Sequence, residues 1–139
     1  MQVELILWPV LVQVFLTLGM FVLLGVRKAK AIREGGVDRQ KAALDNHAWP
    51  AGVIKVSNNI QNQFQTPILF YVLCLAFLII NGVSLAVFLI ACMYSVSRLI
   101  HAYIHVGSNY VPARLRAFMI GCIALIALSI MLVLQLAVN

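Results

Sequence analysis

Acidic residues are scarce in this chain. Among its 139 residues only four are Asp or Glu, against ten Lys and Arg, which leaves a formal net charge of +6. The acids are Glu4, Glu34, Asp38 and Asp45, so none follows the first third of the sequence. The rest of the chain therefore supplies no carboxylates. It has none for acid–base catalysis by a carboxylate pair and none to bind a metal ion through carboxylate oxygens.

Cysteine and histidine are also few. Cys74, Cys92 and Cys122 lie singly in apolar runs with no CxxC pair, so we expect small core side chains rather than disulfides or metal ligands. His101 and His105 form HxxxH, but the glutamate of the zinc motif HExxH is missing. Two histidines one turn apart on a helix cannot bind haem from both faces. The sequence predicts no metal and no haem.

Long apolar runs dominate what is present. The chain is 63% hydrophobic and only 10% charged, with a mean hydropathy of +1.01, which is typical of an integral membrane protein. Several runs approach the roughly 20 residues that cross a bilayer. The first has no basic leader or cleavage site, so we expect it to remain as a span. We predict an all-α membrane domain over residues 1–139, with four transmembrane helices at about 3–34, 53–81, 83–107 and 113–138.

The basic residues gather beside the predicted spans. Seven of the ten lie in the link at about 27–56, and Arg114 and Arg116 lie in the other long link. By the positive-inside rule, both long links are predicted to be cytoplasmic and both termini to be on the non-cytoplasmic side of a multi-pass protein. Topology and anionic membrane lipid thus explain the positive charge, and no nucleic-acid partner is expected.

The second predicted helix begins with many amide side chains. Asn58, Asn62 and Gln65 follow at spacings of four and three and so share a face. Pro67 removes a backbone donor and predicts a bend. These amides are too polar to face lipid. We therefore expect self-association, with the amide face of one copy against the Arg98 face of a neighbour.

A second polar face is predicted on the third helix. Arg98, His101, His105 and Asn109 follow at spacings of three, four and four. A cation within a span is costly unless it faces a cavity or a partner, so Arg98 predicts a functional site. Arg114 adds a second cation at the start of the fourth helix. Guanidinium groups without counter-acids favour a pocket for an anionic ligand.

A structural explanation of the arginines stays open at this point. Arg98 could extend to lipid phosphate or reach Asp45 in the link, because long basic side chains often place their charge in water. Arg114 and Arg116 would then act only as topology signals. The residues alone do not decide between this explanation and the anionic pocket.

Two motifs nevertheless resemble a known family. The polar start of the second helix ends in Asn62-Gln63-Phe64-Gln65-Thr66-Pro67, and Arg98-xx-His101-xxx-His105 is followed by Pro112-x-Arg114. Together with the four-helix topology, these resemble the MAPEG family, the membrane-associated proteins of eicosanoid and glutathione metabolism. The resemblance covers essentially the whole chain. It implies a homotrimer of four-helix protomers, with glutathione in clefts between neighbours and a lipophilic co-substrate arriving from the bilayer.

The resemblance also implies the ligand-binding residues of the second helix. Glutathione-dependent members carry an arginine, an asparagine four residues later and a glutamate three after that. Asn62 matches the asparagine, whereas Asn58 and Gln65 stand at the arginine and the glutamate. Asn58 removes a positive charge and Gln65 removes a negative one, so the net charge of the site is unchanged. Both amides can still form hydrogen bonds with a peptide.

Roles for the third and fourth helices follow from the same resemblance. Arg98 and His101 match family positions, and His105 stands where a tyrosine usually contacts glutathione. Arg114 matches the arginine that stabilises the thiolate, so Arg114 and His101 are the expected catalytic residues. Arg98 would orient a carboxylate, while His101 would donate a hydrogen bond or carry a proton.

Two functions are compatible with these residues. The first is a glutathione- or thiol-dependent transferase or peroxidase that acts on a lipophilic small molecule at the protomer interface. The second is a non-catalytic lipid-binding or accessory membrane module of a larger complex. The departures at Asn58, Gln65 and His105 would also suit a different thiol or another anionic amphiphile.

Overall fold

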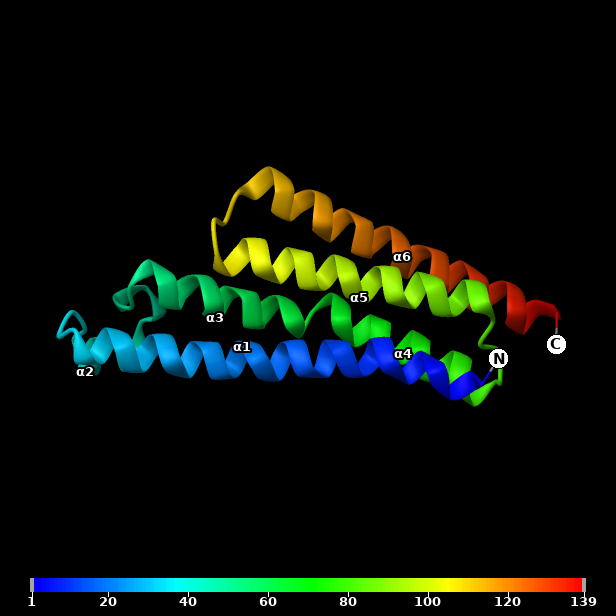
Figure 1. The fold of residues 1–139 in the computed structure, drawn as a ribbon, viewed down its shortest axis with the longest axis horizontal. Helices are drawn as coiled ribbons and strands as arrows, with labels where there is room; N and C mark the ends of the chain where they lie inside the picture. The colour runs from blue at the N-terminus through cyan, green and yellow to red at the C-terminus, as the bar shows by residue number, and fades with distance from the viewer. Residues whose placement is uncertain (1, 139) are drawn as a thin grey trace.

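The chain folds into long helices that lie side by side, and the N- and C-termini lie at the same end of the bundle (Figure 1). The computed structural model describes residues 2 to 138. A short 3-10 helix, η1 (Val3–Ile6), leads directly into α1 (Leu7–Arg33). The other elements are α2 (Arg39–Leu44), η2 (Asn46–Ala48), α3 (Ala51–Gln63), α4 (Thr66–Ile79), α5 (Leu85–Val106) and α6 (Val111–Val138).

Four stretches are long and apolar enough to cross a membrane, which agrees with the predicted all-α class. They are Val3–Arg33, Ala51–Ile79, Leu85–Val106 and Val111–Val138. The second contains α3 and α4, which are separate helices joined at Phe64 and Gln65.

The bend expected at Pro67 is thus a break just before it. Gln65 has φ −107° and ψ −97°, outside helical geometry, and α4 restarts at Thr66. Pro67 lies in the first turn of α4, where its missing N–H loses no intrahelical hydrogen bond. Gln65, in this break, shares a cleft with residues of α6.

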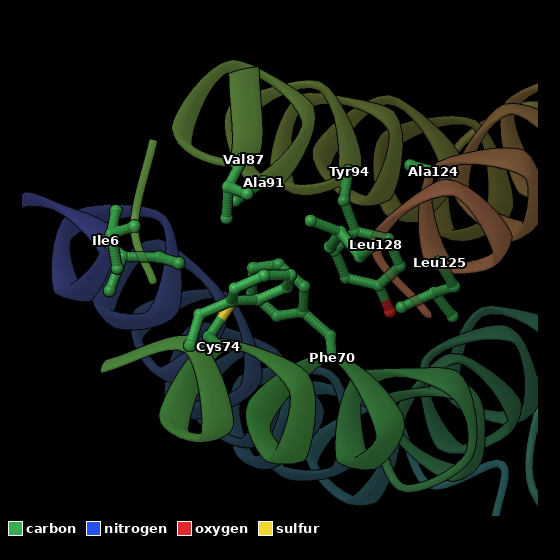
Figure 2. Packing of buried hydrophobic residues seen from close by; sticks show 11 residues of the cluster. Ile6, Phe70, Cys74, Val87, Ala91, Tyr94, Ala124, Leu125 and Leu128 are labelled. Carbon is green, nitrogen blue, oxygen red and sulfur yellow. The ribbon is translucent and has the colours of Figure 1, made fainter. Parts of the chain in front are cut away.

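The apolar core lies in the half of the bundle that contains the termini. The rings of Phe70 and Tyr94 stack with centroids 4.3 Å apart, and Cys74 is buried beside them as a small core side chain (Figure 2). The core cluster comprises Ile6, Phe70, Cys74, Phe77, Val83, Val87, Ala91, Tyr94, Ala124, Leu125 and Leu128. Burial of these side chains against one another stabilises the packing of η1, α4, α5 and α6.

The basic link folds back onto the end of α1. Asp38 caps α2 by accepting hydrogen bonds from the main-chain N–H groups of Gln40 and Lys41. The indole N–H of Trp49 donates to the carbonyl oxygen of Ala42 at 3.2 Å. The Lys28 ammonium lies 4.7 Å from the Trp49 ring centroid, a cation–π contact. Trp49 therefore holds the link in place.

Two basic side chains hold the C-terminal end of α5. Arg27 of α1 donates to the carbonyl oxygen of Gly52 at 2.7 Å and to that of Val106 at 3.1 Å. Lys55 of α3 donates to the carbonyl oxygen of Gly107 at 2.9 Å. The last carbonyls of a helix lack helical partners and carry partial negative charge, so cations are favourable there. These contacts fix the start of the turn that leads into α6.

Candidate functional site

The two predicted polar faces meet within a single chain. Arg98 of α5 is only 1% exposed, and its Nη2 donates to the carbonyl oxygen of Asn62 at 3.2 Å. The Nδ1 atom of His105 lies 3.4 Å from the amide nitrogens of both Asn59 and Asn62. The expectation that the Arg98 face packs against a neighbouring copy is therefore wrong. That face is covered by the chain's own α3, which lies beside α5.

Arg98 has no acidic partner within residues 2 to 138. The carboxylate of Asp45 instead accepts from the main-chain N–H of His47 at 2.8 Å, so neither pairing with Asp45 nor extension to lipid describes Arg98. Its Nε and Nη1 atoms are buried and have no hydrogen-bond partner among the described residues. The guanidinium carbon lies 6.0 Å from the ring centroid of Phe118. The guanidinium of Arg98 is therefore a buried positive charge with no ion-pair partner among the described residues.

The two histidines of α5 hold their protons on opposite nitrogens. Nδ1 of His101 lies 3.1 Å from the carbonyl oxygen of Arg114, and because a carbonyl only accepts, Nδ1 carries the proton. Nε2 of His101 is then an acceptor, and within the described residues it has no partner. His105 has the opposite tautomer. Its Nδ1 faces the amide NH₂ groups of Asn59 and Asn62 and accepts from them, so its proton is on Nε2.

The turn between α5 and α6 differs from the prediction. Asn109 was expected on the α5 face, but α5 ends at Val106, and Asn109 has φ +54°. Asn is among the few residue types that tolerate this left-handed conformation. Its side-chain oxygen accepts a hydrogen bond from Nη1 of Arg114. Asn109 therefore positions the guanidinium of Arg114.

A cleft of about 240 Å³ brings most of the predicted site residues together. Its lining consists of Asn62, Gln65, His101, Val111, Arg114, Leu115 and Phe118. Arg98 and His105 are buried beside it and reach it through Asn62. Asn58 does not line the cleft and is exposed on α3. The lining contains a guanidinium, an imidazole and two amides but no carboxylate, so it suits an anion.

Two buried amides were not among the predicted site residues. Asn59 and Gln63 are at most 2% exposed, and the Gln63 amide donates to the Asn59 side-chain oxygen at 3.1 Å. A signal for them exists in the sequence. Val53 and Val56 are also buried on α3, and the same helical stripe continues through Asn59 and Gln63.

An apolar groove of about 360 Å³ lies next to the cleft, between α4 and α6. Thr66, which follows the cleft residue Gln65, begins it, and the Thr66 hydroxyl accepts from Tyr94 at 3.3 Å. Its remaining walls are Leu69, Cys122, Leu125, Ile126, Ser129 and Ile130. The cleft with its two cationic or imidazole side chains and an apolar groove therefore adjoin on one side of α6.

The side chains that commonly bind metal ions are scattered in the described part of the chain. No three His, Cys, Asp or Glu side chains among residues 2 to 138 lie close enough together to hold one. The polar side chains that line the cleft are those of Arg114, His101, Asn62 and Gln65.

Comparison with known proteins agrees with the resemblance noted from the motifs. The family model of the MAPEG family matches residues 5–134 of the 139. No curated protein and no solved structure matches the chain. The matched range includes all the cleft residues and nearly all of the four membrane-spanning stretches. The chain is therefore a multi-pass integral membrane protein and belongs to the MAPEG family.

Proposed function

We propose that this protein is a glutathione- or thiol-dependent enzyme that joins an anionic thiol to a lipophilic acceptor from the bilayer. One observation carries the proposal. Arg114 and His101 line the same cleft, which has no carboxylate in its lining, and the buried Nε2 of His101 has no hydrogen-bond partner among the described residues. Glutathione is the thiol with which the family is associated.

The charge of the cleft supports binding of an anion. Arg114 supplies a guanidinium at the surface of the cleft, and Arg98 adds positive potential from behind Asn62. Arginine matches the carboxylates of a peptide thiol well because its donors are fixed in a planar fork. With Nη1 of Arg114 held by Asn109, the rest of the guanidinium can face a ligand. Asn62 and Gln65 would form hydrogen bonds with peptide groups.

The tautomer of His101 supports a step in which the thiol is added to the acceptor. Nε2 takes the proton from the S–H group, and Arg114 stabilises the thiolate that forms. The sulfur lone pair then attacks an electrophilic carbon, such as one in an epoxide or a conjugated carbonyl. The electrons of the broken C–O or C=C bond move onto the acceptor, which takes the proton back from His101. No oxidant or metal is needed.

The apolar groove beside the cleft supports a lipophilic acceptor. Thr66 joins the two sites, since Gln65 lines the cleft and Thr66 lines the groove. Leu69 and Ile126 provide apolar walls that an acyl or aromatic group could contact. An acceptor with its reactive carbon towards Gln65 would lie next to the bound sulfur.

The test is an ultraviolet difference titration of the purified protein with glutathione, which detects the thiolate band. Arg114→Ala is the test variant, and Arg33→Ala, an exposed arginine at the end of α1, is the matched control. We expect a saturable band in the wild type and in the control, and none in Arg114→Ala. A band that survives in Arg114→Ala would remove Arg114 from the mechanism.

The alternative is a non-catalytic lipid-binding or accessory module. It is favoured by the neutral amides at Asn58 and Gln65 and by His105, which depart from the glutathione-binding pattern. Asn58 and Gln65 are exposed in the single chain, so they could also serve an interface. Absence of any thiolate band, together with a co-purifying lipid or protein partner, would favour this function.

We also propose that the protein assembles as a homotrimer. Asn58 and Gln61 of α3, and Gln65 in the break after it, are exposed within a stretch long enough to cross the membrane. Polar groups facing hydrocarbon cost several kcal/mol each, so another copy would cover them. Chemical crosslinking in membranes should stop at the trimer. A monomer that keeps the thiolate band would contradict this assembly while leaving the enzymatic proposal intact.

We propose that both long links face the cytoplasm and both termini the other side. The termini lie at one end of the bundle and the basic link at the other (Figure 1). Seven of the ten basic residues occupy that link, as the positive-inside rule favours for a cytoplasmic segment. Tags at both termini should be accessible to protease only from the non-cytoplasmic side.

A further inference from the structure

A second apolar groove lies between α5 and α6, on a different face of α6 from the candidate site. The candidate cleft uses Arg114 and Phe118 of α6, whereas this groove uses Arg116 and Ile120. Its volume is about 530 Å³, within the range of about 300 to 1,000 Å³ that is usual for ligand pockets. The lining is Cys92, Met93, Val96, Ser97, Ile100, Ile104, Ala113, Arg116, Ala117 and Ile120.

Small side chains on α6 create this groove. Ala113, Ala117 and Gly121 follow at spacings of four, so they share one face of the helix. A Cβ atom added to Gly121 would lie only 2.9 Å from the hydroxyl oxygen of Ser97, which shows how closely α5 and α6 approach there. Because Ala113 and Ala117 are short, they do not fill the space next to the longer side chains of α5, and this space is the groove. The groove therefore follows from the backbone packing of two long helices.

Arg116 is the only charged residue in the lining. It is exposed, and no carboxylate within residues 2 to 138 forms an ion pair with it. It lies in the first turns of α6, at the end of the groove nearest the turn between α5 and α6. The groove thus combines an apolar channel with a free cation at one end. Both features match an amphiphile with an anionic head.

We propose that this groove binds one acyl chain of an anionic phospholipid, with the lipid phosphate on Arg116. The apolar walls alone would not retain a lipid, because bilayer hydrocarbon solvates a chain equally well. Selectivity must therefore come from packing in the channel and from the charge of Arg116. Basic pockets between transmembrane helices bind anionic head groups in this manner. The inference does not depend on the proposed enzymatic activity.

Photocrosslinking in defined bilayers tests the proposal. The protein is placed in phosphatidylcholine nanodiscs that contain a minority of phosphatidylglycerol with a photoactivatable acyl chain, and the adducts are mapped by mass spectrometry. A second sample carries the same acyl chain on phosphatidylcholine. We expect adducts concentrated at residues 92–104 and 113–120, and more of them with phosphatidylglycerol.

Substitutions at Arg116 and at Ala113 separate the effect of the charge from that of the apolar groove. Arg116→Gln should lower the phosphatidylglycerol adducts about fivefold, the effect of one well-placed cation near a membrane, and Arg116→Lys should largely restore them. Ala113→Phe fills the channel and should remove the adducts of both lipids. Ala137→Phe, at the far, exposed end of α6, is its matched control and should change nothing.

Several outcomes would overturn the proposal. Adducts spread evenly over all lipid-facing helices, or unchanged in both Arg116→Gln and Ala113→Phe, would mean ordinary lipid contact. Crosslinks from this face to a second copy would mean that the groove is a subunit interface. The glutathione titration in the same nanodiscs reports separately on Arg114, so failure of the lipid site and failure of the enzymatic proposal can be distinguished.

Discussion

Nδ1 of His101 lies 3.1 Å from the main-chain carbonyl oxygen of Arg114, so the residue that would accept a proton is held by the residue that would stabilise the thiolate. One hydrogen bond connects α5 to the first turn of α6 and also selects the tautomer of His101. The relative position of His101 and Arg114 therefore depends on how α5 and α6 pack. Each part of this relationship can be tested separately.

The first prediction concerns His101. In His101→Asn the shorter amide can still donate to the Arg114 carbonyl, while the acceptor at the position of Nε2 is lost. We expect normal thermal stability and glutathione binding, with turnover lower by about 10²-fold or more, as for loss of a general base. Equal turnover in His101→Asn and wild type would exclude His101 as the proton acceptor. Stability is measured by thermal unfolding and turnover with a model electrophile.

The second prediction concerns Asn109, which has φ +54° and accepts from Arg114. Asn109→Gly keeps the backbone conformation available and removes only the side chain, whereas Asn109→Ala adds backbone strain of about 1 kcal/mol. We expect both variants to weaken the thiolate band equally, and only Asn109→Ala to unfold at a lower temperature. A normal band in Asn109→Gly would mean that Asn109 does not position Arg114.

The third prediction separates function from stability at Arg98. Its buried Nε and Nη1 atoms have no partner in the described part of the chain, and such uncompensated burial is unfavourable. Arg98→Met should therefore raise the stability of the protein by about 1 kcal/mol while weakening glutathione binding several-fold. Thermal unfolding and the difference titration measure the two effects. A less stable variant with unchanged binding would assign Arg98 a purely structural role.

The fourth prediction concerns Arg27, which donates to the carbonyl oxygens of Gly52 and Val106. Hydrogen bonds from charged groups contribute about 1.5 to 3 kcal/mol each, and this side chain makes two. Arg27→Ala should lower the unfolding temperature and raise amide hydrogen exchange at residues 106–110. Arg33→Ala, which removes an exposed arginine of the same helix, should do neither. Unchanged exchange in Arg27→Ala would show that the turn is held by other contacts.

Much of the fold follows from local properties of the sequence. The number of spans and the all-α class depend on hydropathy summed along segments, which needs no knowledge of what packs against what. The break near Pro67 is a property of the proline ring. The polar character of the cleft was also predictable, because Asn62, Gln65, His101 and Arg114 are polar residues in or beside apolar runs.

The inner and outer amides of α3 were harder to assign. Asn58, Asn59, Asn62 and Gln63 lie close together on one helix, and the stripe through Val53 and Val56 that indicates the buried amides is short, so the contact with α5 is needed to make the assignment definite. Asn59 and Gln63 face inwards and Asn58 faces outwards, a difference of a single residue in the phase of the helix. The family pattern, in contrast, directed attention to Asn58.

By itself, then, the sequence determined that this is a four-span membrane protein with an excess of positive charge and few acids, because composition and local periodicity contain that information. Only the tertiary structure decided which side chains share a cleft, which nitrogen of His101 is free, and that Asn109 serves Arg114. The cleft and the tautomer of His101 depend on contacts between residues distant in the chain, and the contact of Asn109 with Arg114 depends on the conformation of the turn between α5 and α6.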